Sequence, residues 1–243
     1  MSAPLFFVPA LPTAASRLVL DGAEGRHAAT VRRIGVGERV DVADGDGGWA
    51  HCVVSSVGKA ELVLDVLASG VDPPPAPRFV LVQALAKGGR DELAVETATE
   101  LGVDEVVPWQ AARSVVQWRG ERGAKARTGW ESTARAAAKQ SRRARVPAIA
   151  ALASSADVQA RIGGAALAVV LHEDADAALA GVPLPAAGDV VLVVGPEGGI
   201  TPAELELFRG AGASVCRLGP HVLRSSTAGP AALAVLSAAV RWR

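Results

Sequence analysis

A glycine-rich segment at residues 195–199 (GPEGG) directly follows the apolar run 190–194. Residues 201–204 (TPAE) come next, and this spacing of Thr, Pro and Glu is typical of a helix start. Glycines between a strand and a helix let backbone amides approach a ligand closely. The segment is not a phosphate-binding Walker loop, because no Gly-Lys-Ser/Thr follows it. It therefore predicts either a ligand-binding loop or only a tight strand-to-helix turn.

Two other segments could contact the same ligand. Residues 218–228 (LGPHVLRSSTA) connect an apolar strand to the last helix, and residues 171–173 (LHE) end another strand. Ligands of open α/β sheets bind beyond the carboxyl ends of the strands. His172 and His221 are candidate general bases because imidazole titrates near neutral pH. Each could equally be an ordinary polar loop residue. Together the three segments could enclose one polar cofactor.

Positive charge is concentrated in one part of the chain. The whole sequence has 25 Lys and Arg residues against 25 Asp and Glu, yet residues 110–146 contain ten basic side chains and two acidic ones. Such a cluster favours contact with RNA phosphates, and a solvated basic face is the alternative. Arg135, Lys139 and Arg142 are spaced to share one face of a helix predicted over 128–143.

Apolar periodicity in the second part of the chain predicts an α/β fold with a parallel sheet, because its strands are apolar on both faces. The expected strands are 79–84, 106–107, 167–171, 190–194 and 214–218. The expected helices are 91–101, 128–143, one that begins at 201, and 227–240. The last helix is apolar all round, which predicts that it is buried, plausibly against a second subunit.

The first part of the chain predicts a small β-barrel, because short alternating runs are separated by turns. The expected strands are 17–20, 39–42, 49–54 and 61–67, with one helix over 25–33. The proline-rich residues 73–77 predict a stiff linker. The expected domains are therefore residues 1–72, the linker 73–77, and residues 78–243.

Composition excludes several classes of protein. Half of the residues are apolar, which excludes a disordered chain. Cys52 and Cys216 cannot build a disulfide framework or a metal cluster, so we expect no metal. The stretch 5–15 lacks a preceding basic residue and contains prolines, which argues against a signal peptide. The longest apolar run, 228–240, is too short to span a membrane. We expect a cytoplasmic protein without a membrane partner.

Taken together and in order, these segments resemble the SPOUT methyltransferases with a trefoil knot, and within them the RsmE-type 16S rRNA (uracil-N3)-methyltransferases. The resemblance covers nearly the whole chain. It is carried by residues 195–199, 218–219, 222–224, 227–228, 87–108, 113–116 and 136–147, and by His27 with residues 31–33 (VRR).

The resemblance implies a PUA-like β-barrel followed by a knotted α/β domain. It implies a homodimer that binds S-adenosylmethionine and methylates N3 of a uridine near the decoding centre of 16S rRNA, and we expect the assembled small subunit as substrate. The cofactor-binding residues carried over are Leu171, His172, Gly195, Glu197, Gly198, Gly199, Leu218, Gly219 and Leu223. The RNA-binding candidates are Arg26, His27, Arg32, Arg33, Arg113, Arg135, Lys139, Gln140, Arg142 and Arg143.

Arg224 is the candidate catalytic residue, because an arginine beside the cofactor loop could stabilise negative charge that develops on the uracil oxygens. The alternative is a structural arginine paired with Glu197. Glu197 itself could hold the cationic end of the cofactor or orient the base, or it could only cap the local turn. Two positions depart from the family pattern: Thr97 replaces a basic residue, and Ser226 replaces a glutamate.

Two other functions are compatible with the sequence. The same fold also serves ribose 2′-O methyltransferases, and nucleoside mass spectrometry distinguishes methylation of the base from that of the ribose. A non-catalytic RNA-binding assembly factor would bind rRNA without affinity for S-adenosylmethionine.

Overall fold

The computed structural model describes residues 3–11 and 16–242, and it divides into two compact units. The first unit comprises Met1–Pro74 together with Ala138–Val146, and the second comprises Pro75–Ala137 and Pro147–Arg243. Residues 12–15 of the stretch that we tested as a signal peptide lie outside the described residues. The return of 138–146 to the first unit is a feature that the continuous ranges expected from the sequence do not include.

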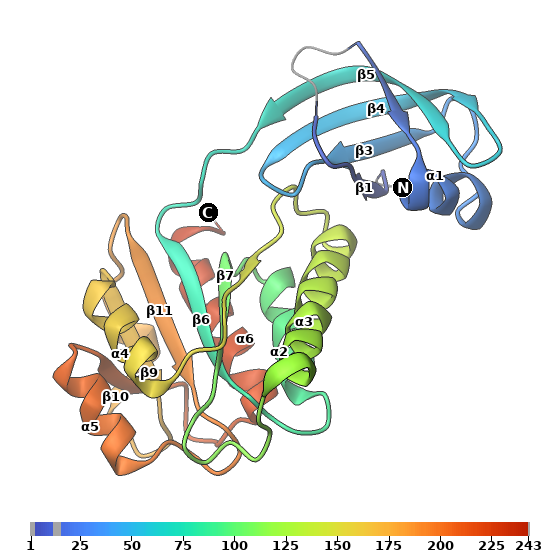
Figure 1. Cartoon of the computed structure of the whole chain (residues 1–243). Coiled ribbons are helices and arrows are strands. Elements are labelled where there is room, and N and C mark those ends of the chain that lie inside the picture. The colour runs from blue at the N-terminus through green and yellow to red at the C-terminus, as the bar shows by residue number, and fades with distance from the viewer. Residues whose placement is uncertain (1–2, 12–15, 243) are drawn as a thin grey trace. The chain divides into compact units, whose positions relative to one another are not determined.

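The first unit contains a five-stranded sheet (Figure 1). Across the sheet the order is β1 (Leu5–Phe7), β3 (Arg39–Ala43), β4 (Gly48–Val57), β5 (Leu62–Val71) and β2 (Arg17–Leu20). The β1 strand runs parallel to β3, and the other pairs are antiparallel. Strands form at all four expected places. β1 was not predicted, because its run of three buried residues is too short to show alternation.

The predicted short helix of this unit forms in two parts. α1 (Gly22–Arg26) continues directly into the π-helical turn η1 (His27–Val31). Gly25 is required in α1, because a Cβ atom there would collide with the carbonyl oxygen of Leu20. Arg33 follows with φ +52°, in the left-handed region.

The segment 138–146 is held to the first unit by backbone and side-chain bonds. The Val146 N–H donates to the Gly45 carbonyl at 2.8 Å, and the Arg145 guanidinium donates to the Asp72 carbonyl at 3.0 Å. Ala138 is buried with Leu5 and other residues of β1 and β3. These contacts tie the segment to the first unit, and Ala138 belongs to the core of that unit.

The second unit is built on a seven-stranded parallel sheet (Figure 1). Its order is β10 (Ala177–Ala178), β12 (Ser214–Arg217), β9 (Leu167–Leu171), β11 (Asp189–Val194), β6 (Arg78–Ala84), β7 (Glu105–Trp109) and β8 (Ala148–Ile149). All five expected strands are present. The edge strands β8 and β10 were not predicted, because a strand of two residues has no periodicity.

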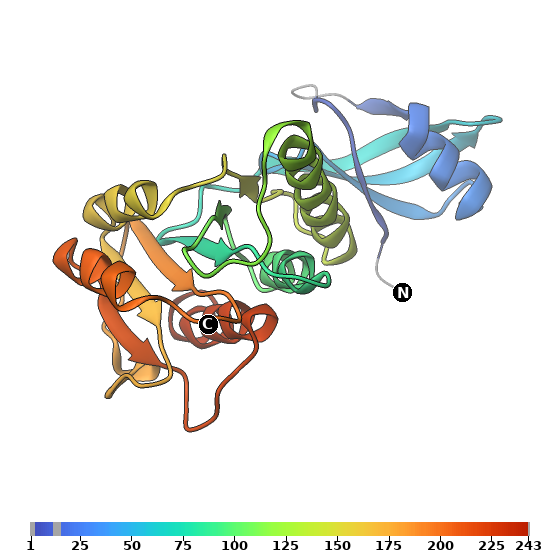
Figure 2. The same cartoon turned by 60° about the horizontal axis from the view of Figure 1, so that its bottom comes forward.

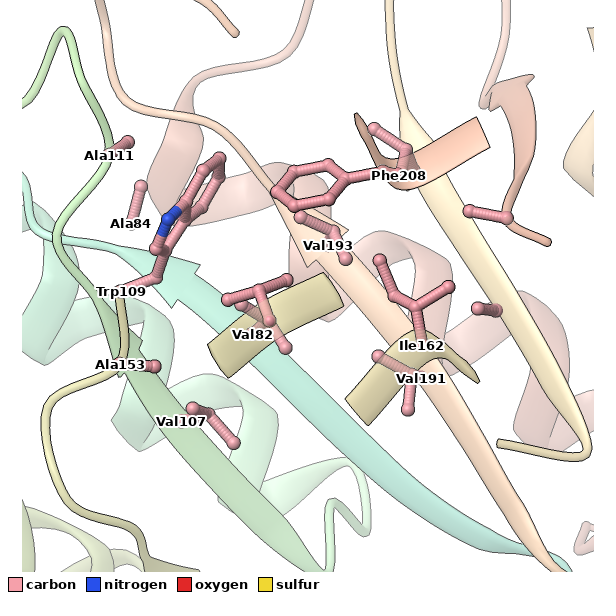
Figure 3. Close-up of a cluster of buried hydrophobic side chains, with 14 of the residues drawn as sticks. Val82, Ala84, Val107, Trp109, Ala111, Ala153, Ile162, Val191, Val193 and Phe208 are labelled. Atoms are coloured by element: carbon pink, nitrogen blue, oxygen red, sulfur yellow. The ribbon is translucent and has the colours of Figure 1, made fainter. Parts of the chain in front are cut away.

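Helices cover both faces of this sheet (Figures 1 and 2). α2 (Arg90–Glu100) and α6 (Ser225–Val240) lie on one face, and α4 (Ser155–Gly164) and α5 (Pro202–Gly210) lie on the other. The second face buries a cluster in which the rings of Trp109 and Phe208 meet edge to face, with centroids 5.4 Å apart (Figure 3). Val82 and Val193 of the central strands pack into the same cluster.

The caps and boundaries of the helices agree with the sequence predictions in some places and differ in others. The expected capping box at the start of α5 is present, because Thr201 and Glu204 bond reciprocally. α4 was missed although Ser154 and Asp157 form the same motif. α3 (Gly120–Gln140) starts at 120 rather than 128 and ends before Arg142. The expectation that Arg142 shares a helix face with Arg135 and Lys139 is therefore wrong.

The last helix is buried on one side only. α6 packs against β6, β11 and α2, but Val235, Ala238 and Ala239 are exposed. It also contacts η2 (Leu179–Gly181), which lies in the connection between β9 and β11. Among the residues that the structure describes, no helix combines the length and apolar character needed to cross a membrane.

Candidate active site

Three loops meet at the carboxyl ends of β9, β11 and β12 and form a pocket of about 280 Å³. A smaller hollow of about 100 Å³ shares part of its wall. Because the three strands are parallel, their carboxyl ends lie at the same edge of the sheet. The larger pocket is lined by Arg90, Leu171, His172, Glu173, Val194, Gly195, Pro196, Glu197, Gly199, Ile200, Val222, Leu223, Arg224, Ser225 and Ala228.

The structure brings the predicted cofactor-binding residues together. Leu218 and Gly219 line the smaller hollow, and Gly198 lines a third hollow beside Arg113. All the others line the larger pocket; they are Leu171, His172, Gly195, Glu197, Gly199 and Leu223. Arg224, the candidate catalytic residue, lines this pocket as well.

The glycine loop after β11 is folded so tightly that side chains would not fit. A Cβ atom on Gly195 would lie 2.6 Å from Cγ1 of Ile200, and one on Gly198 would lie 3.0 Å from Cβ of Arg113. Gly199 has φ +75°, a conformation that residues with a Cβ rarely adopt. At these three glycines the loop is therefore bare backbone, and two of them, Gly195 and Gly199, line the pocket.

Glu197 is held by a partner that the sequence did not reveal. Its Oε1 atom accepts a hydrogen bond from Arg90 Nη1 at 3.0 Å and another from the Lys87 N–H at 3.3 Å. Burial opposes the ionisation of this carboxyl, but its own N–H, the Lys87 N–H and the Arg90 guanidinium outweigh burial and lower its pKa. The arginine that pairs with Glu197 is therefore Arg90, and not Arg224 as the alternative role of Arg224 would require.

The surroundings of Arg224 leave its side chain available. Arg224 immediately precedes α6, and its carbonyl accepts hydrogen bonds from the N–H groups of Thr227 and Ala228. Within the described part of the chain no bond partner of its guanidinium is found, and the residue is exposed. The next residue, Ser225, is buried and lines the pocket. Ser226 is buried too, but it is not part of the pocket wall.

His172 makes a hydrogen bond that disfavours a role as general base but does not test it. Its Nδ1 atom accepts a hydrogen bond from the Asp174 N–H at 3.2 Å. A neutral imidazole that accepts at Nδ1 carries its proton on Nε2, so Nε2 donates rather than accepts. His221 lies in the smaller hollow and is exposed.

A buried carboxylate, that of Glu204, joins three segments next to the glycine loop. Glu204 accepts hydrogen bonds from the Ala112 N–H at 2.8 Å, from Ser155 Oγ at 2.9 Å, and from the N–H and hydroxyl of Thr201. Burial opposes its ionisation, but these bonds prevail and lower its pKa. The sequence motif predicted the bond to Thr201 only. The contacts to Ala112 and Ser155 join segments that are far apart in sequence.

Arg113 lies against the same loop, since its Nη1 atom donates to the carbonyl of Gly198 at 3.0 Å. This predicted RNA-binding residue is exposed and borders the hollow that Gly198 lines. It is the one RNA-binding candidate that the structure places beside the pocket.

The other RNA-binding candidates differ in how accessible they are. Lys139 has internal partners, because its Nζ atom pairs with Glu24 at 2.5 Å and lies over the ring of Phe6. His27 is half-buried with its ring against Phe6. Arg135 and Arg143 also have partners within the chain. The candidates with exposed positions are Arg26, Arg32, Arg33, Arg135, Gln140 and Arg142.

Family models match both units. One, described as an RNA methyltransferase domain, matches residues 73–237, and another, described as an RNA methyltransferase PUA domain, matches residues 20–67. The fold is thus that of an RNA methyltransferase of the SPOUT type with a PUA-like domain. This confirms the fold class expected from the sequence motifs.

Individual relatives narrow the assignment. Ribosomal RNA small subunit methyltransferase E of Mycobacterium bovis is 45% identical over all of this chain and 94% of its own length, and that of Bacillus subtilis is 31% identical over 90% and 88%. A putative methyltransferase from Legionella pneumophila, solved in complex with the bound cofactor SAM, superposes with a TM-score of 0.85 at 28% identity over 98% of each chain. The chain belongs to the ribosomal RNA small subunit methyltransferase E family.

Proposed function

We propose that this methyltransferase transfers the methyl group of S-adenosylmethionine to N3 of one uridine in 16S rRNA near the decoding centre. The substrate is the assembled small subunit in the cytoplasm. The observation that carries the proposal is the guanidinium of Arg224, which has no partner among the described residues and belongs to a residue that lines the three-loop pocket. Membership of the family and the SAM-bound relative from Legionella pneumophila support it.

The pocket suits the proposed cofactor. Leu171, Val194, Ile200 and Leu223 provide apolar walls for an adenosine. Arg90 and Glu197 provide charges, and the glycine loop brings backbone groups close. When bound, S-adenosylmethionine supplies a methyl group activated by a sulfonium.

The chemistry defines what the protein's own residues must do. The N3–H group of uracil lies in the base-pairing edge, so the base must be unpaired or flipped before it reacts. This proton passes to solvent water, and its loss leaves negative charge on the uracil oxygens. The Arg224 guanidinium, which lines the pocket without an internal partner among the described residues, stabilises that charge. Correct positioning of the two reactants contributes up to about 7–11 kcal/mol to such a transfer.

The exposed side of α6 supports a homodimer. Val235 is 37% exposed and Trp242, just beyond the helix, is 56% exposed. Ala238 and Ala239 lie exposed between them in sequence. We define these four residues as the α6 face. A second copy of the chain would remove this apolar face from water.

RNA is held by arginines outside the pocket. The proposal assigns phosphate contacts to the exposed Arg26, Arg32, Arg33 and Arg142, and it places Arg113 beside the reacting base. Lys139 is a weaker candidate, because an RNA phosphate would have to compete with Glu24.

The test is nucleoside mass spectrometry of 16S rRNA from unmodified small subunits incubated with the protein and S-adenosylmethionine. The wild type is expected to form 3-methyluridine. Arg224→Ala should lose this activity and retain affinity for S-adenosylhomocysteine. Arg39→Ala, an exposed arginine on β3 of the first unit, is the matched control and should remain active.

Each other outcome has a definite meaning. Methylation of ribose would be compatible with the fold, but it would overturn the proposal that N3 of the uridine is the methylated atom. No methylation of any kind, by a wild type that binds the subunit, would favour the assembly-factor function. Full activity of Arg224→Ala would overturn the catalytic role of this arginine.

A further inference from the structure

The polar end of the pocket contains an ion pair that is only partly used within the protein. The Arg90 and Glu197 side chains are 33% and 25% exposed, and both line the pocket. The bonds from Arg90 Nη1 and from the Lys87 N–H both go to Oε1 of Glu197. Apart from the bond donated by the N–H of Glu197 itself, no bond to Oε2 of Glu197 or from the other nitrogens of Arg90 is found in the described ranges. Each partner therefore keeps hydrogen-bonding capacity toward the pocket.

The chain builds a rigid support for Arg90. Gly88 and Gly89 take φ +68° and +72°, which turns the backbone sharply before Arg90 begins α2. The buried carboxylate of Asp91 accepts hydrogen bonds from the N–H groups of Ala86 and Glu92. The turn is thus tied on one side to α2 and on the other to Glu197. A guanidinium held in this way loses little entropy when it binds a ligand.

We propose that the Arg90–Glu197 pair recognises the α-amino acid end of S-adenosylmethionine. The unused edge of the Arg90 guanidinium donates to the α-carboxylate, and Oε2 of Glu197 accepts from the α-ammonium. This inference rests on the proposed cofactor. The ligand end carries one positive and one negative charge, and the pair presents the complementary charges side by side. The planar guanidinium also matches the geometry of a carboxylate.

This assignment separates the roles of the two arginines in the pocket. Arg90 has an acidic neighbour, and a pair of opposite charges suits a ligand group that is itself a zwitterion. Arg224 makes no such pair among the described residues, so its full charge stays available for the developing uracil anion. Arg90 is therefore a binding residue, and the proton and methyl transfers do not pass through it.

The experiment measures dissociation constants by isothermal titration calorimetry with two ligands and no RNA. S-adenosylhomocysteine has the amino acid end, and 5′-methylthioadenosine lacks it. Arg90→Met is expected to raise the dissociation constant of S-adenosylhomocysteine about 10- to 100-fold, the range expected for loss of a charge-assisted hydrogen bond. It should leave the affinity for 5′-methylthioadenosine unchanged. Arg90→Lys keeps the charge but lacks the planar guanidinium, so its dissociation constant for S-adenosylhomocysteine should lie between those of the wild type and Arg90→Met.

Arg161→Met is the matched control. Arg161 also pairs with a glutamate, Glu105, at 2.9 Å, but neither residue lines the pocket. This variant should bind both ligands as the wild type does. Thermal unfolding of every variant checks that the fold is intact.

The pH dependence gives a readout that a purely structural role would not produce. Glu197 has a lowered pKa, so its charge is present near neutral pH and is lost only as the pH falls through that value. The affinity for S-adenosylhomocysteine should fall over the same pH range. In Arg90→Met the pKa of Glu197 rises, so the fall should begin at a higher pH. The binding of 5′-methylthioadenosine should show neither effect.

Three results would overturn the inference. Equal losses for both ligands would mean that Arg90 only holds the glycine loop in place. Unchanged affinity for both would mean that the pair has no role in binding. If the wild type bound neither ligand, the cofactor assignment itself would fail together with the inference.

Discussion

Arg142 occupies a backbone position where helices usually have glycine. It has φ +59° at the end of α3, and the Arg143 N–H closes the helix by donating to the carbonyl of Ala138. The same kind of helix end follows α2 and α5, and there the residue is Gly102 or Gly212. A residue with a Cβ in this conformation costs about 1–2 kcal/mol. The proposed contact with an RNA phosphate is a functional reason to keep an arginine there.

Replacing Arg142 should separate stability from RNA binding. We expect Arg142→Gly to raise the free energy of unfolding by about 1 kcal/mol, because the strain is relieved. The same variant should bind 16S rRNA more weakly, with a salt dependence reduced by about one counterion. Urea denaturation and filter binding over a salt series measure the two effects.

Arg142→Ala is the control for this pair of effects. It removes the charge and keeps a Cβ atom in the left-handed conformation, so RNA binding should fall equally while stability stays near that of the wild type. Equal stability of the glycine and alanine variants would contradict the strain argument, and unchanged RNA affinity would contradict the phosphate contact.

At the scale of the elements, Glu204 joins the start of α5 to the segment 110–116 and to α4. Its pKa is lowered in the folded protein, so it stabilises the fold above its ordinary pKa near 4.5, and this contribution is lost as the pH falls through the folded value. We expect Glu204→Gln to lower the free energy of unfolding at neutral pH by about 2–3 kcal/mol, because an amide cannot accept all four hydrogen bonds.

The free energy of unfolding measured at acid pH checks the same prediction. The difference between wild type and Glu204→Gln should shrink as the pH falls from about 4.5, where the carboxyl of the unfolded chain takes up a proton, to the lower pKa of the folded protein. Chemical denaturation at a series of pH values measures this. A difference that stayed constant with pH would show that charge on Glu204 does not stabilise the fold.

Close packing of α6 on the sheet depends on Gly229. A Cβ atom at this position would lie 2.9 Å from Cδ1 of Leu81. We expect Gly229→Ala to destabilise the protein by about 1–3 kcal/mol. It should also weaken binding of S-adenosylhomocysteine, because α6 begins next to Arg224 at the pocket. Gly163→Ala on α4 is the control, since open space surrounds that position, and it should be neutral or slightly stabilising.

How far the sequence predicted the structure depended on how local each signal was. The capping box of Thr201 and Glu204 spans three positions, and its prediction is confirmed. Long apolar strands such as β11 were also predicted, because burial on both faces leaves a continuous apolar run. The pairing of Arg90 with Glu197 was not predictable, since the two residues are 107 positions apart and only the folded sheet brings them together. The glycine loop was a candidate from its place between a strand and a capped helix, and the resemblance to a known family assigned it to a cofactor pocket together with Arg224.

At the scale of the whole molecule, the chain has no net charge, so it has no global field that would attract RNA. The attraction must come from local groups of arginines. The first unit contains Arg26, Arg32 and Arg33 on one segment and Arg142 on the returning segment 138–146. The second unit contains the pocket and Arg113. The N-terminal segment Met1–Pro74 taken alone therefore underestimates the positive charge of the first unit, because residues after α3 contribute part of that charge.

The α6 face is the proposed dimer interface. Ala238 is exposed on a helix whose other side packs on the sheet. Analytical ultracentrifugation should show the wild type as a dimer and Ala238→Glu as a monomer, because the substitution would bury an unpaired charge in the proposed interface. Ala160→Glu makes the same change at an exposed position on α4 and should remain a dimer. A monomeric wild type would refute the homodimer, whereas a dimeric Ala238→Glu would place the interface elsewhere.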